Sequence, residues 1–187
     1  MAARSLLLRL FVAALFVLVG LEASAQPTQR QIVVDGQRRD FFVDVPPWII
    51  TMGQPVPVVL VLHGAGLDAQ WAIEATHFEV NGFNEGFITV FPEARSSVSW
   101  KLWDATHCCW PAFYDPVEEI GFVTAILGWL TDRYSVDPRR IYLAGFSNGG
   151  MMVHQVAAAL SDRIAAIGVV GGAVFGDEAT PTHPVPA

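Results

Sequence analysis

The fold of this chain is centred on the stretch Ile141-Tyr142-Leu143-Ala144-Gly145-Phe146-Ser147-Asn148-Gly149-Gly150-Met151-Met152. An apolar run of strand length leads into the pattern Gly-x-Ser-x-Gly, and an Ala-rich segment typical of a helix follows. A strand, a sharp turn and a helix are the context that a nucleophile elbow requires. The chain before and after such a serine lies close together, so its neighbours two positions away must lack bulk, and Gly145 and Gly149 meet this condition.

Ser147 is therefore the predicted nucleophile. The turn exposes its hydroxyl and places it near the positive end of the following helix, which favours negative charge in the reacting group. The alternative is a glycine-rich turn in which the serine only caps the helix.

Residues 1–25 are predicted to be a secretory signal peptide. Arg4 and Arg9 form a basic region, an apolar run from Leu10 to Leu21 follows, and Ala23-Ser24-Ala25 is a small-residue cleavage site. The run is shorter than the about 20 residues that span a bilayer. We expect cleavage after Ala25 and a secreted product, extracellular or periplasmic, with no stable membrane anchor. The alternative is an uncleaved anchor.

Composition limits the partners. The chain has 187 residues and a formal net charge of −7. Residues 26–187 are enough for one domain with a sizeable core. Because there is no basic patch, neither nucleic acid nor an anionic membrane surface is expected as a partner. No cofactor and no metal site are expected either.

The remaining segments indicate an α/β fold with a mainly parallel sheet and helices on both faces. The predicted strands are an edge hairpin (Gln31–Asp35 and Asp40–Val45, joined by residues 36–39), Val56–Leu62, Phe87–Pro92, the elbow strand and Ile164–Val170. The predicted helices are Trp71–Phe83, one starting at Asp115-Pro116-Val117-Glu118 with Asp115 as its cap, and the elbow helix. Prolines bracket a predicted loop around Trp48.

The strand Val56–Leu62 ends in His63-Gly64-Ala65-Gly66. In α/β-hydrolases the loop after the third strand supplies one oxyanion-hole N–H, and the residue after the serine supplies the other. The predicted donors are Ala65, or Gly66 in its place, and Asn148. His63 is expected to orient the loop by hydrogen bonding and not to catalyse.

A long loop, residues 96–113, contains Trp100, Trp103 and Trp110. Loops of this length inside a compact domain are usually functional. The tryptophans either form a binding wall for an aromatic or sugar substrate or cover the sheet edge, and both interpretations stay open.

Two neighbouring pairs invite a catalytic reading. Cys108 and Cys109 are adjacent, so their Cα atoms lie about 3.8 Å apart, below the about 4.4–6.8 Å usual for a disulfide, and a bridge between them would be strained. Their spacing supports neither a zinc site nor a cysteine nucleophile. Glu118 and Glu119 resemble a general acid/base pair, but their place in a first helical turn is explained by capping and by the helix dipole.

Several motifs together resemble the secreted poly(3-hydroxybutyrate) depolymerase and feruloyl esterase-like group of α/β-hydrolases. They are His63-Gly64, Cys108-Cys109, Val117-Glu118-Glu119-Ile120-Gly121-Phe122, Tyr134-Ser135-Val136-Asp137-Pro138 and Gly145–Met152. The resemblance implies a serine carboxylic ester hydrolase. It also implies hydroxyalkanoate polyesters, or feruloylated or acetylated plant polysaccharide, as substrates. The chain departs from the family at Trp110, where glycine is typical, and at Glu118-Glu119, where Asp-Asp is commoner.

The resemblance also implies a triad in the chain order serine, acid, histidine. Only one predicted strand follows the elbow, so residues 26–187 are expected to form a partial domain that lacks its C-terminal acid- and histidine-bearing part. Asp177 and His183 have the right chemistry and order, but they are six residues apart on a glycine- and proline-rich tail and are not expected to be the pair. His154, on the elbow helix, is expected at the surface or in packing.

Three functions remain open at this point. The first is an ester hydrolase that acts through Ser147 and an acyl-enzyme. The second is a truncated, catalytically inactive remnant with a binding role or no function, since a serine without its base loses most of its catalysis. The third, a peptidase of the same fold, shares the elbow but lacks support from the other motifs.

Overall fold

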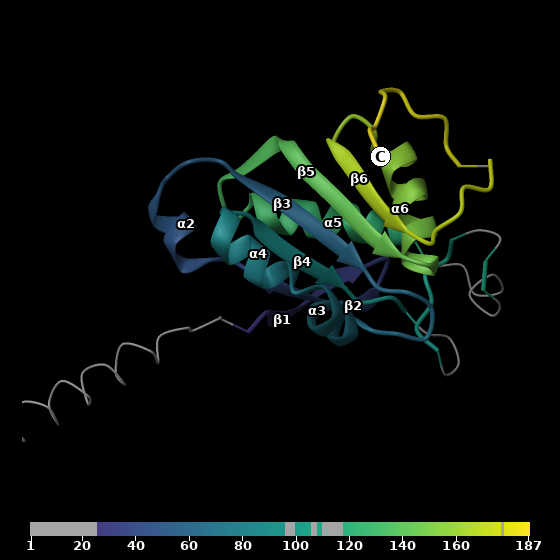
Figure 1. The fold of residues 1–187 in the computed structure, drawn as a ribbon, viewed down its shortest axis with the longest axis horizontal. Helices are drawn as coiled ribbons and strands as arrows, with labels where there is room; N and C mark the ends of the chain where they lie inside the picture. The colour runs from purple at the N-terminus through teal and green to yellow at the C-terminus, as the bar shows by residue number, and fades with distance from the viewer. Residues whose placement is uncertain (1–25, 96–99, 106–107, 110–117, 177) are drawn as a thin grey trace, which may run out of the picture.

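The structure, a computed structural model, describes residues 26–95, 100–105, 108–109, 118–176 and 178–187. These residues contain a six-stranded sheet with the strand order β1-β2-β4-β3-β5-β6 (Figure 1). The strands are β1 (Thr28–Val34), β2 (Gln37–Asp44), β3 (Val56–Leu62), β4 (Ile88–Pro92), β5 (Val136–Phe146) and β6 (Ala166–Val170). Strands β4, β3, β5 and β6 are neighbours in this order and run parallel to one another, and β1 and β2 form an antiparallel hairpin at one edge.

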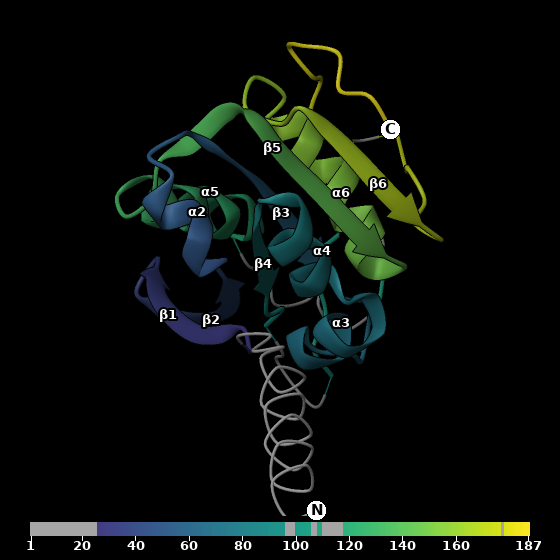
Figure 2. The ribbon, with the colours of Figure 1, turned by 60° about the vertical axis from the view of Figure 1, so that its left-hand side comes forward.

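Helices cover both faces of the sheet (Figure 2). They are α2 (Pro47–Thr51), α3 (Ala69–Thr76), α4 (Phe78–Glu85), α5 (Glu119–Thr131) and α6 (Asn148–Ala159). Side chains of β3 contribute to two apolar clusters, one on each face of the sheet, because successive side chains of a strand point to opposite faces. Leu60 and Leu62 belong to the cluster that contains α5 and α6, whereas Val61 packs with α3. The predicted α/β class, with a mainly parallel sheet and helices on both faces, is confirmed.

The edge hairpin is tighter than predicted. Its turn is Asp35-Gly36 alone, and both residues have positive φ (49° and 76°), as a two-residue hairpin turn requires. The pairing of Val34 with Gln37 therefore extends the strands into the predicted connection.

Two helix predictions and one loop prediction are corrected. The predicted helix Trp71–Phe83 is split into α3 and α4 by His77, which lies in the left-handed region at φ 51° and ends α3. The short helix α2 replaces the predicted loop around Trp48, with a proline in its first turn. Helix α5 begins at Glu119, because the Glu118 carboxylate accepts the Gly121 N–H and caps the helix, and the predicted cap Asp115 lies outside the described residues.

None of the helices in the described ranges combines the length and the apolar character that crossing a membrane requires.

Candidate active site

Ser147 lies at the turn between the end of β5 and the start of α6. Its backbone has φ 54° and ψ −120°, a combination that non-glycine residues rarely adopt. Its peptide N–H donates to the Val170 carbonyl oxygen of β6 at 2.8 Å, so the turn is fixed to the neighbouring strand. The serine side chain makes no capping hydrogen bond to α6. The helix-cap alternative therefore does not hold, and the hydroxyl is not used by the helix.

The glycines around Ser147 are required by space. A Cβ atom on Gly145 would lie 2.6 Å from the Gly149 carbonyl oxygen, and one on Gly149 would collide with the carbonyl oxygens of Leu62 and His63. A Cβ on Gly150 would lie 2.8 Å from Val169 Cγ1. The elbow thus packs backbone to backbone against the end of β3.

The predicted oxyanion-hole loop lies beside the elbow. A Cβ on Gly64 would be 3.0 Å from Phe146 Cδ1 and 3.3 Å from the Phe146 carbonyl oxygen. The Gly66 N–H donates to the Lys101 carbonyl oxygen at 2.9 Å and is therefore occupied. The Ala65 N–H makes no hydrogen bond to any of the described residues, so of the two alternatives Ala65 is the one with a donor to offer. The Asn148 N–H, in the first turn of α6, has no intrahelical acceptor.

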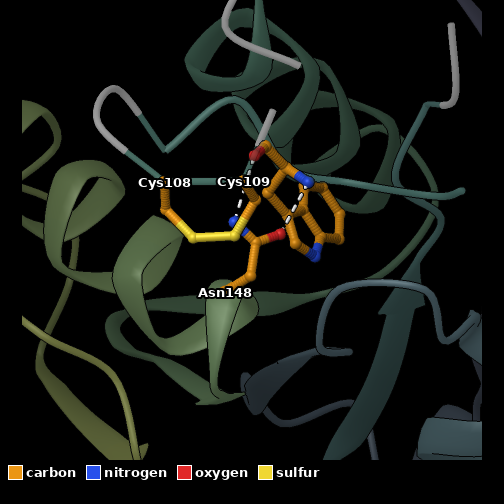
Figure 3. Close-up of a disulfide and its surroundings, with 4 residues drawn as sticks. Cys108, Cys109 and Asn148 are labelled. Atoms are coloured by element: carbon orange, nitrogen blue, oxygen red, sulfur yellow. Dashed lines mark hydrogen bonds between the residues drawn. A yellow bond between two sulfur atoms is a disulfide. The ribbon is translucent and has the colours of Figure 1, made fainter. Parts of the chain in front are cut away.

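Buried hydrogen bonds hold the Asn148 side chain. Its Oδ1 accepts the Trp103 backbone N–H at 2.8 Å, and its Nδ2 donates to the Trp103 carbonyl oxygen at 3.2 Å (Figure 3). The Trp103 indole N–H in turn donates to the His63 carbonyl oxygen at 2.8 Å. His63, Trp103 and Asn148 are all fully buried. The sequence did not predict this link, because it joins residues 40 and 45 positions apart.

His63 serves the loop through hydrogen bonds, as the sequence predicts. Its Nδ1 lies 2.8 Å from the Gly64 carbonyl oxygen. Its Nε2 accepts the Ala94 N–H at 3.1 Å and lies 3.0 Å from Glu93 Oε1. Both ring nitrogens are therefore engaged, and the ring has no free nitrogen with which to act as a base.

Among the other histidines, His77 Nδ1 lies 3.6 Å from Glu79 Oε1 of α4. The His183 N–H donates to Ser161 Oγ, just beyond the end of α6. Because α6 has 12 residues, it is about 18 Å long, and Ser147 lies at its other end. His154 lies within α6 and lines a surface cavity with Glu178. Asp177 and His107 lie outside the described residues. Among the residues that the structure does describe, no histidine ring is hydrogen bonded to Ser147.

The structure joins Cys108 and Cys109 in a disulfide, the bridge that their adjacency disfavours. Cys109 has φ 73°, so the backbone turns at the second cysteine. Figure 3 shows the bridge beside Asn148. The Cys108 N–H donates to the Ala105 carbonyl oxygen at 3.4 Å, which connects this turn to the Trp103 segment.

Glu118 and Glu119 have different roles. Glu118 is the N-cap of α5, whereas the sequence predicts that both glutamates lie inside the first helical turn. Glu119 is only 2% exposed, and its Oε2 accepts from Arg39 of β2 at 2.7 Å, so the helix dipole does not explain it. Burial raises the pKa of the Glu119 carboxyl, although the Arg39 charge acts in the opposite direction. The Arg39–Glu119 ion pair is a buried structural link between β2 and α5 that the sequence does not predict.

The two described tryptophans of the long loop differ in their exposure to solvent. Trp103 is fully buried in the core, whereas Trp100 is 63% exposed. Trp100 lies on the oxyanion-hole loop, since a Cβ on Gly66 would be 3.6 Å from its ring. Trp110 lies outside the described residues. Of the two described tryptophans in this segment, Trp100 is therefore the exposed one, and it lies against the loop at Gly66.

Comparisons with known proteins agree on an esterase. Residues 41–183 match the family model described as esterase PHB depolymerase. The bifunctional acetylxylan esterase/xylanase XynS20E of Neocallimastix patriciarum is 30% identical over 142 residues, which are 75% of this chain and 19% of that protein. The putative esterase NocK of Nocardia uniformis subsp. tsuyamanensis is 30% identical over 166 residues, or 88% of this chain and 47% of that protein. Feruloyl esterase B of Thermothelomyces thermophilus is 30% identical over 133 residues, or 68% of this chain and 45% of that protein.

Solved structures show the same fold. A ferulic acid esterase superposes with a TM-score of 0.59 at 20% identity, covering 76% of this chain and 58% of that one. A thermostable esterase gives 0.57 at 19% identity, covering 75% and 40%. These likenesses confirm the predicted α/β-hydrolase fold. The chain spans less than half the length of the three curated relatives.

Proposed function

The chain belongs to the PHB depolymerase family of esterases, and we propose that it is a secreted serine carboxylic ester hydrolase with Ser147 as its nucleophile. One observation carries the proposal. Ser147 has a strained backbone and a hydroxyl that does not cap α6, and it lies beside a loop that offers the Ala65 N–H. Strain of this kind persists only where the surrounding structure enforces it, and it is concentrated at active sites.

The chemistry follows from this arrangement. Ser147 Oγ bonds to the ester carbonyl carbon as its proton passes to a base, and the carbonyl oxygen takes the negative charge. The Ala65 and Asn148 N–H groups stabilise that oxyanion. The intermediate then expels the alcohol, which receives the proton, and leaves an acyl-enzyme that water hydrolyses. We propose that the base and its acid partner come from a C-terminal part of the domain outside residues 26–187, since no described histidine ring is hydrogen bonded to Ser147.

The proposed substrates are esters of a hydroxyalkanoate polyester or of feruloylated or acetylated polysaccharide. Two relatives are named for acetylxylan and feruloyl esters. The exposed Trp100 ring beside Gly66 offers a flat face to an aromatic acyl group or a sugar. The net charge of −7 disfavours nucleic acid as a partner.

Secretion rests on the sequence of residues 1–25. The basic start, the apolar run and Ala23-Ser24-Ala25 support cleavage after Ala25. The mature protein is then expected to begin at Gln26 on N-terminal sequencing. Intact Met1 in a membrane fraction would support an anchor instead.

The second candidate is an inactive remnant of such an esterase, with a binding role or no function. It is favoured by one observation, the lack of a described histidine at Ser147. The two candidates differ in whether the full-length protein turns over esters.

The deciding experiment measures hydrolysis of p-nitrophenyl butyrate and labelling by a fluorophosphonate. The full-length protein should do both, and Ser147→Ala should abolish both. Ser135→Ala, a change at an exposed serine remote from the elbow, should alter neither. Residues 26–187 alone are expected to show little or no turnover. Hydrolysis that survives Ser147→Ala would contradict the assignment, and a full-length protein with neither activity would favour the remnant.

A further inference from the structure

The two proposed oxyanion-hole donors belong to different parts of the fold. The Ala65 N–H lies in the loop after β3, and the Asn148 N–H starts α6 after β5. An oxyanion hole requires both donors at about 2.7–3.1 Å from one oxygen position. Something must therefore fix the distance between these two segments.

Trp103 contacts both segments. Its backbone N–H and carbonyl oxygen pair with the Asn148 side chain at 2.8 and 3.2 Å, and its indole N–H donates to the His63 carbonyl oxygen at 2.8 Å. The His63 ring then lies 2.8 Å from the carbonyl oxygen of Gly64, the residue before Ala65. The ring centroids of His63 and Trp103 are 5.3 Å apart, so they also pack together.

Burial makes these bonds strong positional constraints. His63, Trp103 and Asn148 each have no exposed surface, so water cannot replace a lost partner. In such surroundings hydrogen bonds strengthen, and unpaired polar groups become costly. The Trp103 segment is itself held, because the Ala105 N–H donates to the Trp103 carbonyl oxygen at 2.8 Å.

We propose that Trp103 is a positioning residue that holds the Ala65 and Asn148 N–H groups at the spacing of an oxyanion hole, gripping the first through His63 and the second through the Asn148 side chain. This inference rests on the proposed function. Trp103 does not touch the reacting atoms and acts only through the two donor segments. Misplacement of a catalytic group by about 1 Å can cost about 10²-fold in rate, so loosening either grip should slow the reaction.

Two variants each remove the hydrogen bonds to one of the two donor segments and keep both main-chain N–H donors. Trp103→Phe removes the indole N–H and keeps a buried ring, and Asn148→Ala removes the amide that Trp103 holds. In the full-length protein, which includes the proposed C-terminal part with the base, each should lower kcat by about 10–100-fold with KM little changed, below the about 10²–10³-fold cost of deleting a donor outright. Because both variants disrupt the same Trp103-centred arrangement, the kcat of the double variant should fall by less than the product of the two single effects.

The matched control is Trp129→Phe. Trp129 of α5 packs on Phe41 and Tyr134 at ring distances of 5.3 and 6.1 Å, away from the elbow. The Trp129→Phe substitution makes the same chemical change at a half-buried position that packs against the core, and it should leave kcat unaltered. Equal losses of kcat in Trp103→Phe and Trp129→Phe would show a general packing effect and overturn the inference.

A second readout does not depend on hydrolysis. Amide hydrogen exchange at Gly66 and Leu67, whose N–H groups donate to Lys101 and Gly64, should accelerate in Trp103→Phe and not in Trp129→Phe. Unchanged exchange there overturns the inference, as does faster exchange with full kcat. If the wild-type protein shows no Ser147-dependent hydrolysis, the proposed function fails, and the exchange rates alone decide whether Trp103 holds the loop.

Discussion

Ser147 has a backbone conformation that suits glycine better than serine, although the proposed reaction needs its hydroxyl. A non-glycine residue at φ 54° and ψ −120° carries strain of about 1–3 kcal/mol, whereas glycine adopts positive φ readily. We expect Ser147→Gly to have a free energy of unfolding about 1 kcal/mol higher than Ser147→Ala, with both variants inactive. Urea unfolding measures the difference.

The same pair of substitutions at Ser135 is the control. Ser135 does not have a positive φ, so Ser135→Gly should be less stable than Ser135→Ala because glycine loses more chain entropy on folding. If Ser147 gave the same order as Ser135, the strain at the elbow would be energetically unimportant.

The sequence predicts the residues of the elbow well because their requirements are local. Gly145 is limited by Gly149, only four positions along the chain, so the spacing of the glycines around Ser147 reveals the turn, although Gly149 is also limited by the distant Leu62 and His63 carbonyl oxygens. The roles of Trp103 and Arg39 are not local. Trp103 contacts Asn148 across 45 positions and Arg39 contacts Glu119 across 80, and no periodicity along the chain encodes such contacts.

At the scale of elements, the Arg39–Glu119 pair connects β2 to α5. Its atoms are 2.7 Å apart, both side chains are buried, and the guanidinium also lies 3.9 Å from the Phe122 ring centroid. Arg39→Met should lower the free energy of unfolding by about 3–5 kcal/mol, because it leaves the Glu119 carboxyl buried without its partner. The Arg39→Met/Glu119→Leu double variant should recover much of this loss.

Denaturant unfolding of the wild type, Arg39→Met and the double variant measures these differences in the free energy of unfolding. The exposed pair of Asp137 and Arg140, 2.8 Å apart, provides a comparison, and Arg140→Met should cost less than Arg39→Met. A double variant no more stable than Arg39→Met would mean that cavity formation, and not the unpaired charge, dominates.

Element boundaries are where the sequence is least informative. The apolar pattern continues across His77, so it predicts one helix where the backbone turns left-handed and starts a second. Strand β3 is predicted to the residue, because an unbroken apolar run buried on both faces has no competing structure.

At the scale of the whole molecule, Asp44 makes stability depend on pH. Burial, and to a lesser degree the nearby Glu79 carboxyl, raises the pKa of Asp44 from 3.8 to about 6. Between these values the folded protein binds the proton more tightly than the unfolded chain does. Its contribution to stability is therefore complete below about pH 4 and is lost as the pH rises through about 6.

Asp44→Asn should remove this dependence. The Tm of the variant minus that of the wild type should increase from pH 4 to pH 7, as followed by thermal unfolding at constant ionic strength. A difference that stays constant over this range would show that Asp44 does not titrate within it.

The hydrogen bond from the Ser147 N–H to the Val170 carbonyl oxygen has a consequence for the order of folding. The elbow also packs against the ends of β3 and β5, so three strands brought from distant parts of the chain must be aligned before the serine can take up its conformation. Contacts of such sequence separation form late, because chain entropy must first be lost. A nascent or partly folded chain therefore carries Ser147 as an ordinary serine, and the reactivity that we propose for it appears only when the sheet is assembled through β6.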